Sequence, residues 1–299
     1  MSFERRKSKP MKLFRRSTSS PWQPAWRLDA GATLWRLKFS NTGRILGEAR
    51  DLEAKTSSFF CCDEADGQLR WKDLRLEEPW WVGLEDIDAG RFYLHGFRKP
   101  DMPQHLGIFA YDLDTGAPLW QNRELAYLFA FDGNVYASQQ RFDGAHVLRL
   151  SSEDGSVAEE LGIQNESVNA IRSILNGEDV FAGYRYPAQF DETHPAFDEF
   201  HSRVHAVIDP AAVTGNLDVL QEKNLLLISW HERLPGKPQI LKQEFAAVDA
   251  ESGASLFHDT IVEEATATGV DSFFAKDDQL FYIKNFSILT AHDLTSVTA

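Results

Sequence analysis

The stretch "IFAYDLDTGAPLW", residues 108–120, decides the fold of this chain. It contains a short apolar run, then Asp112, a turn with Gly116, and a second run that ends on Trp120. The Asp112 carboxylate can accept backbone N–H groups across the turn, and glycine adopts the positive φ that such turns need. The pattern predicts a β-hairpin whose terminal tryptophan covers the edge of the next sheet.

The same pattern recurs along the chain. "FFCCDEADGQLRW" ends at Trp71, "EFAAVDAESGASLF" ends at Phe257, and weaker copies surround Gly155 and Gly215. A second kind of hairpin lies between the copies, as in "PWWVGLEDIDAGRFYLHGF" and "AYLFAFDGNVYASQQ". A single hairpin cannot bury both of its faces, so the copies are expected to stack. Two hairpins make one four-stranded propeller blade.

The repeats divide the chain into about six units. They are expected to begin near Thr33, Pro79, Leu125, Glu166, Leu217 and Gly269, a spacing close to the ~40–50 residues of propeller repeats. The sequence therefore predicts an all-β propeller of about six four-stranded blades over residues 23–299. Five or seven blades remain open, because the fourth and fifth units are poorly defined. The last unit is one strand short, and "PAWRLD", residues 24–29, is expected to supply that strand and close the ring.

The phrase "FAYDLDTGAPLW" resembles the repeat of quinoprotein (pyrroloquinoline-quinone, PQQ) β-propellers. Residues 108–120 match well, and residues 59–71 and 245–257 match in part. Proteins with such repeats include dehydrogenases, assembly scaffolds and uncharacterised bacterial propellers, and the chain is most similar to the last group. The catalytic Asp and calcium ligands of the dehydrogenases match no motif here, so no cofactor is expected. Such a fold serves many functions.

Cys61 and Cys62 are the only cysteines. In the quinoprotein alcohol dehydrogenases that the repeat resembles, a disulfide between adjacent cysteines lies against the cofactor. Here the pair belongs to an apolar run that is expected to form a third strand, in which successive side chains point to opposite faces. Free cysteine commonly packs as a small hydrophobic residue. We expect two reduced cysteines in the core.

Composition and charge narrow the classes of function. Hydrophobic residues make up 43% of the chain and the net charge is −14, so a packed acidic body is expected that repels nucleic acid. In contrast, residues 1–20 contain seven Lys or Arg and one Glu. Residues 1–22 are expected to form a disordered basic arm, able to contact an acidic surface; whether Met11 is the true start stays open. With no export signal and no long apolar run, the cytoplasm is the expected location, without a transmembrane segment.

The segment "YPAQFDETHPAFDEFHSRVH", residues 186–205, is longer than a hairpin loop should be. Its candidate partner-binding residues are Phe190, Asp191, His194, Phe197, Phe200 and His201. An aromatic and acidic loop favours docking of a protein. The histidine spacing matches no metal motif, so no metal is expected.

The stretch "EPWW", residues 78–81, opens an expected inner strand. Trp80 and Trp81, with Glu85 in the following residues, are therefore candidates for the mouth of the axial channel. Asp residues precede five of the turns and are expected to cap them rather than to form a catalytic ring; they are Asp63, Asp112, Asp209, Asp249 and Asp293. No catalytic motif is present. The sequence favours a non-enzymatic protein-interaction scaffold; the alternative is an enzyme or small-ligand binder with a site at the channel.

Overall fold

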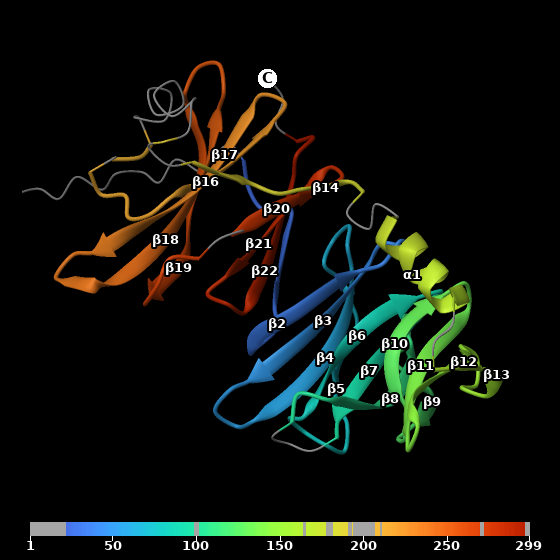
Figure 1. Ribbon diagram of the computed structural model, residues 1–299. Helices are drawn as coiled ribbons and strands as arrows, with labels where there is room; N and C mark the ends of the chain where they lie inside the picture. Colours follow the sequence, from blue (N-terminus) through green and yellow to red (C-terminus); the bar gives the residue numbers. More distant parts are fainter. Residues whose placement is uncertain are drawn as a thin grey trace, which may run out of the picture.

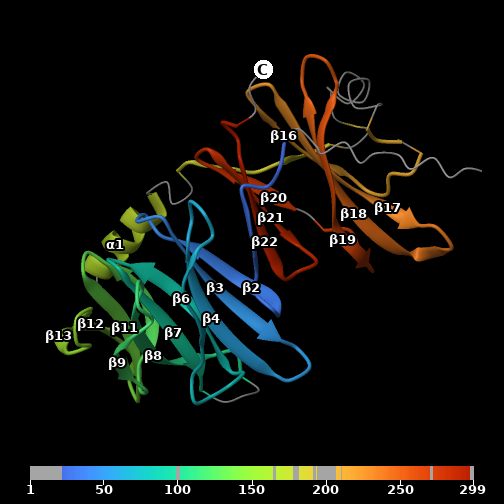
Figure 2. The same cartoon turned by 180° about the vertical axis from the view of Figure 1, so that it is seen from behind.

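The computed structural model describes residues 22–98, 102–163, 166–177, 182–190, 193, 207–209, 211–269 and 272–296. In these ranges the chain forms five antiparallel sheets of four or five strands and a single helix. Figure 1 shows that the sheets follow one another along an arc, and Figure 2 shows the same arrangement from behind. The predicted all-β propeller architecture is confirmed. No helix in the described part of the chain has the length and apolar character that a membrane span requires.

The first three sheets are four-stranded meanders whose strands lie side by side in chain order. The first contains β2 (Thr33–Phe39), β3 (Arg44–Asp51), β4 (Thr56–Asp63) and β5 (Leu69–Leu74). The second contains β6 (Val82–Asp88), β7 (Arg91–Phe97), β8 (His105–Asp112) and β9 (Pro118–Asn122). The third contains β10 (Ala126–Phe131), β11 (Asn134–Arg141), β12 (Gly144–Ser151) and β13 (Val157–Gly162). Since β6 contacts both β2 and β10, these first strands form the inner side of the arc.

The other two sheets have five strands each. One contains β15 (Ala188–Phe190), β16 (Leu217–Glu222), β17 (Leu225–Leu234), β18 (Lys237–Asp249) and β19 (Ser255–Ala265). The last sheet contains β20 (Phe273–Lys276), β21 (Gln279–Lys284) and β22 (Ile288–Asp293), with β14 (Tyr184–Arg185) beside β20.

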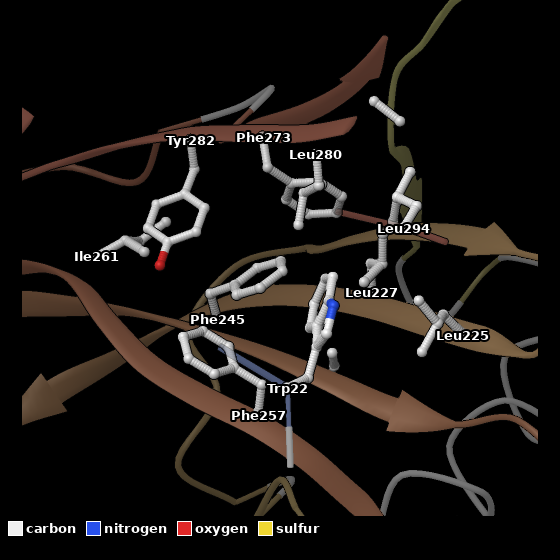
Figure 3. Packing of buried hydrophobic residues seen from close by; sticks show 12 residues of the cluster. Trp22, Leu225, Leu227, Phe245, Phe257, Ile261, Phe273, Leu280, Tyr282 and Leu294 are labelled. Carbon is white, nitrogen blue, oxygen red and sulfur yellow. The ribbon is translucent and has the colours of Figure 1, made fainter. Parts of the chain in front are cut away.

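An N-terminal strand completes the last sheet, as predicted. β1 (Trp26–Asp29) pairs antiparallel with β22, and Trp26 lies opposite Ala291. Just before this strand, Trp22 is only 2% exposed and packs in a cluster with Phe245 and Phe257 (Figure 3). The two ends of the described chain therefore share one sheet and one core.

Tryptophans of outermost strands join neighbouring sheets. In three places an indole N–H donates to a backbone carbonyl in the turn after the third strand of the next sheet. The bonds run from Trp26 to Glu64 (3.1 Å), from Trp71 to Leu113 (2.8 Å) and from Trp120 to Ser152 (2.9 Å). The prediction that the terminal aromatic covers the next sheet is confirmed.

In three repeats the turn glycine, Gly67, Gly116 or Gly155, makes room for that tryptophan. A Cβ at Gly116 would lie 2.9 Å from Cδ2 of Trp71, and the residue has a φ of +68°. A side chain at this position would therefore meet both a ring and a backbone conformation that favours glycine. The glycine and the tryptophan of the phrase thus belong to one contact, although they come from different copies.

The adjacent cysteines are free and fully buried in β4. Cys61 packs with Leu84 in the core toward the second sheet, whereas Cys62 packs with Phe281 in the core toward the last sheet. Burial raises the pKa of each thiol to about 12, so neither is a reactive thiolate at neutral pH. The prediction of two core residues is confirmed.

The start predicted for the fourth unit is wrong. Glu166 begins a helix, α1 (Glu166–Gly177), instead of a strand. Val168, Ile171 and Leu175 follow the spacing of one helical face. Val168 is 3% exposed and packs against Phe129 in the core beside the third sheet. Five sheets, rather than six, therefore occupy the described residues, a count that the sequence had left open.

Four of the five turn aspartates accept backbone N–H groups as predicted. The pairs are Asp112 with Thr115 (2.9 Å), Asp209 with Ala211 (3.0 Å), Asp249 with Ser252 (2.7 Å) and Asp293 with Thr295 (2.7 Å). Asp63 differs, because its carboxylate lies 2.8 Å from Arg44 and 3.0 Å from Arg70. That aspartate binds guanidinium groups instead of capping its turn.

Candidate functional site

The predicted channel-mouth tryptophans lie in the segment that leads into β6. The side chain of Glu78 accepts the backbone N–H groups of Trp80 and Trp81, each at 3.0 Å. This carboxylate fixes the turn and holds the two indoles at the beginning of an inner strand. Trp81 is 37% exposed and Trp80 is half-buried.

A cation stacks between tryptophans of the first two sheets. The guanidinium of Arg50, at the end of β3, lies 4.9 Å from the ring of Trp80 and 5.2 Å from the ring of Trp35. The ammonium of Lys55 lies 4.8 Å from the ring of Trp80. Trp35 is 55% exposed. The ends of β2 and β3 and the segment before β6 thus form one aromatic and cationic surface of Trp35, Arg50, Lys55 and Trp80. We call it the tryptophan surface and include Trp81, the exposed residue that follows Trp80 in the chain.

A buried ion pair supports this surface from below. Glu48 is fully buried and lies 2.5 Å from Nε of Arg50. Its other oxygen accepts the backbone N–H of Leu84 at 2.9 Å, while Arg50 donates to the carbonyl of Val82 at 2.6 Å. These bonds attach β3 to the inner strand β6, so the tryptophan surface rests on two sheets that are held together.

Glu85, the third predicted residue, sits at an irregularity of β6. The register with β7 shifts between Leu84 and Asp86, which leaves Glu85 as an extra residue on its strand. Such bulges change the direction of a side chain. Oε1 of Glu85 lies 2.7 Å from Nδ1 of His105 and 3.0 Å from Nδ1 of His95.

The two histidines stack on each other. The rings of His95 and His105 are 3.5 Å apart between centroids and 9° from parallel. Phe97 contacts both rings edge-on and also contacts Trp81. The histidine pair is therefore continuous with the tryptophan surface through Phe97.

The environment favours charge on Glu85 and opposes it on His95. Burial would raise the pKa of the Glu85 carboxyl, but the two neighbouring imidazoles hold that pKa below its usual value. Burial lowers the pKa of the His95 imidazole, although the Glu85 carboxylate opposes this shift. At neutral pH the cluster therefore contains a carboxylate beside a neutral buried imidazole.

A second concave region lies between the first and last sheets. It has a volume of about 940 Å³ and its lining includes Phe39, Tyr184 and Lys276. Lys276 is 2.6 Å from Glu64, and Arg44 is ion-paired in the same region with Asp63. Because Lys276 and Arg44 are already ion-paired, neither is available to bind an anionic ligand.

The predicted partner-binding loop is described only at its edge. Phe190 lies in β15, opposite Leu217, and packs partly buried against the core of that sheet. The other predicted residues lie outside the described residues; they are Asp191, His194, Phe197, Phe200 and His201. Their role stays a prediction.

Sequence reasoning found Glu85 but missed His95 and His105. The histidines stand ten residues apart, on neighbouring strands, and no metal-ligand spacing connects them. The available signal was positional: His95 belongs to the strand that pairs with the one containing Glu85. Only the register of the sheet shows that the three side chains meet.

A comparison of the sequence with known families finds a match over part of the chain. Residues 40–120 match the family described as a domain of unknown function, DUF4905. This range includes Arg50, Trp81, Glu85 and both histidines, but less than half of the chain. No curated protein matches the chain.

Several solved structures are similar to the chain at low identity. The exo-beta-1,3-galactanase from Phanerochaete chrysosporium shares 9% identity over 90% of this chain and 64% of its own, with a TM-score of 0.29. BBS1N, solved in complex with ARL6DN, shares 10% identity over 92% and 97%, with a TM-score of 0.35. The β-propeller domain of the Trilobed protease from Pyrococcus furiosus shares 8% over 84% and 63%, with a TM-score of 0.29. The chain thus spans less than two thirds of the galactanase and protease chains, and similarity this low carries no information about its function.

Proposed function

We propose that this chain is a non-enzymatic propeller that binds a protein partner through the tryptophan surface. The observation that carries the proposal is the stacking of Arg50 on both Trp80 and the exposed Trp35, with the exposed Trp81 next to Trp80 in the chain. Tryptophan and arginine are the residue types that contribute most binding energy at protein interfaces.

The tryptophan surface is preorganised for binding. Glu78 fixes the backbone beneath Trp80 and Trp81, and the buried Glu48 fixes Arg50. A side chain that is already ordered loses little rotamer freedom when a partner docks, which would otherwise cost about 0.5–1.5 kcal/mol for each flexible side chain. Rigid aromatic groups therefore favour tight binding here.

The chemistry of the surface suggests the partner segment. Lys55 is exposed and stacks on Trp80. A partner segment that presents apolar side chains to the indoles and a carboxylate to this ammonium would complement the surface. An acidic, apolar peptide segment is the partner class that we propose.

Three further parts of the proposal come from the sequence. The loop at residues 187–202 is a second docking element, and the basic arm, residues 1–22, contacts an acidic surface. The proposed location is the cytoplasm, where thiols such as Cys61 and Cys62 remain reduced. The quinoprotein resemblance also stays a prediction.

Quantitative affinity capture with matched variants tests the surface. Trp81→Ala and Trp80→Ala should each reduce retention of a specific protein partner by at least about tenfold, the effect of a hot spot of about 1.4 kcal/mol or more. Phe142→Ala is the control, because Phe142 is also an exposed aromatic but lies in the distant β11–β12 turn. Equal retention by all variants, or no specific protein retained by the wild type, would contradict the proposal.

The alternative function is a small-ligand binder or enzyme with its site at the inner strands. It is favoured by one observation, the presence of Glu85 and two stacked histidines beside β6. Thermal unfolding with the quinone, calcium or nucleotides would reveal such a ligand. A ligand at about 100 times its Kd should stabilise the chain by about 2.7 kcal/mol.

A further inference from the structure

We propose that Glu85, His95 and His105 bind one divalent first-row transition metal ion, with Zn²⁺ as the best match. The donor set is two imidazole nitrogens and one carboxylate oxygen. Sites with three protein ligands of these types leave a fourth position for water or a substrate group. Such a site goes beyond the proposed partner binding at the tryptophan surface, and the spacing of its residues matches no metal motif.

The three donor groups converge on one point. One donor atom from each residue lies within 4.8 Å of the other two. Zn²⁺ lies at about 2.0–2.2 Å from nitrogen and oxygen ligands. Because the two rings are stacked nearly parallel, one ring must turn before both nitrogens can face the same ion, and His105 is the ring that turns, since its side chain is 38% exposed.

The fold supplies the donors from rigid positions. Glu85 comes from β6, His95 from β7 and His105 from β8, which are neighbouring strands of the second sheet. Sites built on strands hold their ligands more firmly than sites built on loops. The bulge at Glu85 directs its carboxylate toward the histidines.

An unsatisfied buried nitrogen points independently to a ligand. The side chain of His95 is only 3% exposed, and its Nδ1 has no hydrogen-bond partner among the described residues. Although Oε1 of Glu85 is 3.0 Å away, the contact lacks hydrogen-bond geometry. An unpaired buried polar atom is costly, and coordination of an ion at Nδ1 would remove that cost.

An ion can reach the cluster from solvent. The side chain of His105 is 38% exposed, so the cluster is open on one side. Phe97 covers the edges of both rings, which shields the site laterally. This combination of one open side and apolar walls suits a metal with an open coordination position.

Gly83 sets the position of the buried ligand. A Cβ at Gly83 would lie 2.7 Å from Cε1 and 2.9 Å from Nε2 of His95. Glycine is therefore needed opposite this ring, because any side chain would push the imidazole away. Gly83 acts as a positioning residue for the proposed site.

A second cluster, around His146, also combines a histidine with carboxylates, but its donor atoms do not converge on one point. Nδ1 of His146 faces Glu160 at 3.2 Å, whereas its Nε2 faces Asp143 at 3.0 Å. The two carboxylates thus lie at opposite ring nitrogens, and Arg141 already binds Glu160. One ion cannot use both sides of the ring, so His146 is a matched control.

The test is titration of the metal-free full chain with Zn²⁺ against a chromophoric chelator, and with Co²⁺ followed by its visible absorption. The wild type should bind one equivalent, and the Co²⁺ spectrum should indicate low coordination number with nitrogen ligands. His105→Gln and Glu85→Gln should weaken the affinity at least about 100-fold, since even loss of an outer hydrogen-bond partner costs 10–100-fold. His146→Gln should bind as the wild type does.

A second pair of variants keeps all three ligands. Gly83→Ala should weaken Zn²⁺ binding by displacing His95, whereas Gly269→Ala should not, because no heavy atom lies within 4 Å of a Cβ at Gly269. Thermal unfolding of the metal-free variants checks that each one folds. Absence of one-equivalent binding by the wild type, or unchanged affinity in both His105→Gln and Glu85→Gln, would overturn the proposal.

Discussion

Two contacts between neighbouring sheets are covered by different aromatic residues. Between the second and third sheets, Trp120 covers the next turn and donates its indole N–H to Ser152. Between the sheet of β15–β19 and the last sheet, the corresponding aromatic residue is Phe257, whose ring has no N–H group to donate. Trp22 enters from the N-terminal segment instead and donates to the carbonyl of Asp293 at 3.0 Å.

The second contact also buries a histidine. His292 of β22 packs 4.6 Å from the ring of Phe257 and 4.3 Å from that of Trp22. Neither of its ring nitrogens has a hydrogen-bond partner among the described residues. The comparison shows that a repeat whose sequence departs from the regular phrase can keep its apolar packing while a buried polar side chain in it loses its hydrogen-bond partners.

The largest effect is expected from Trp22→Ala. Trp22 fills the core shown in Figure 3 and supplies the indole that Phe257 lacks. Truncation of a buried tryptophan costs about 3–5 kcal/mol, which denaturant unfolding would measure. Trp35→Ala is the control, because this exposed tryptophan should contribute less than about 0.5 kcal/mol. Similar losses in both variants would remove the distinction between core and surface.

Acid should weaken the second contact next. Burial lowers the pKa of the His292 imidazole to about 3, while an unfolded histidine titrates near about 6.5. Between these values the unfolded state binds more protons, so stability should fall by about 1.4 kcal/mol for each unit of decreasing pH.

His292→Leu should flatten that part of the pH profile of unfolding free energy. Some slope should remain, since burial also lowers the pKa of His95 and His231. His258→Gln is the control, because this half-exposed histidine lies at the surface. A profile unchanged by His292→Leu would show that the ring is not kept neutral by its burial.

A smaller loss of stability is expected when the contact between the second and third sheets is changed to resemble the contact made by Phe257. Trp120→Phe keeps an aromatic ring but leaves the carbonyl of Ser152 without its donor. The loss of one hydrogen bond of this kind should cost about 1 kcal/mol. Trp35→Phe, at an exposed ring that makes no such bond between sheets, should be neutral in the same unfolding measurement.

The smallest expected effect is a local opening, which the two cysteines can report separately for two contacts between sheets. Cys61 faces the second sheet and Cys62 faces the last one. Both thiols should resist alkylation in the native state, because each is buried and has its pKa raised to about 12. Trp26→Phe should speed modification of Cys62, located by mass spectrometry, while that of Cys61 stays slow; equal acceleration would mean that the contacts open together.

The regular half of the fold could be predicted from the sequence because its information is local. A turn glycine, a capping carboxylate and a terminal tryptophan lie within about a dozen residues, so copies such as residues 59–71 and 108–120 are recognisable. The beginnings of β2 and β16 coincide with two predicted unit starts, Thr33 and Leu217. The prediction for the fourth unit failed because the apolar residues Val168, Ile171 and Leu175 have helical spacing. That spacing was not distinguished from the pattern of a strand.

The candidate site could be predicted only in part. Trp80 and Trp81 were identified from their place at the beginning of an inner strand, and Glu85 from the residues that follow them. His95 and His105 depend on the register of three strands and on a bulge at Glu85, and sequence spacing does not show either feature. The same limit applies to Arg50, whose stacking partners come from two sheets.

The pairing of β1 with β22 also constrains the order of events during synthesis. Trp22 and Asp293, which share a hydrogen bond, are 271 positions apart in sequence. The ribosome therefore releases the first strand long before its partner exists, and closing so large a loop is entropically costly. The first three sheets can form as they emerge, whereas the last sheet must wait for the C-terminal strands. During that interval the N-terminal segment presents an unpaired strand and an uncovered Trp22, so chaperone dependence and premature aggregation should centre on this end of the nascent chain.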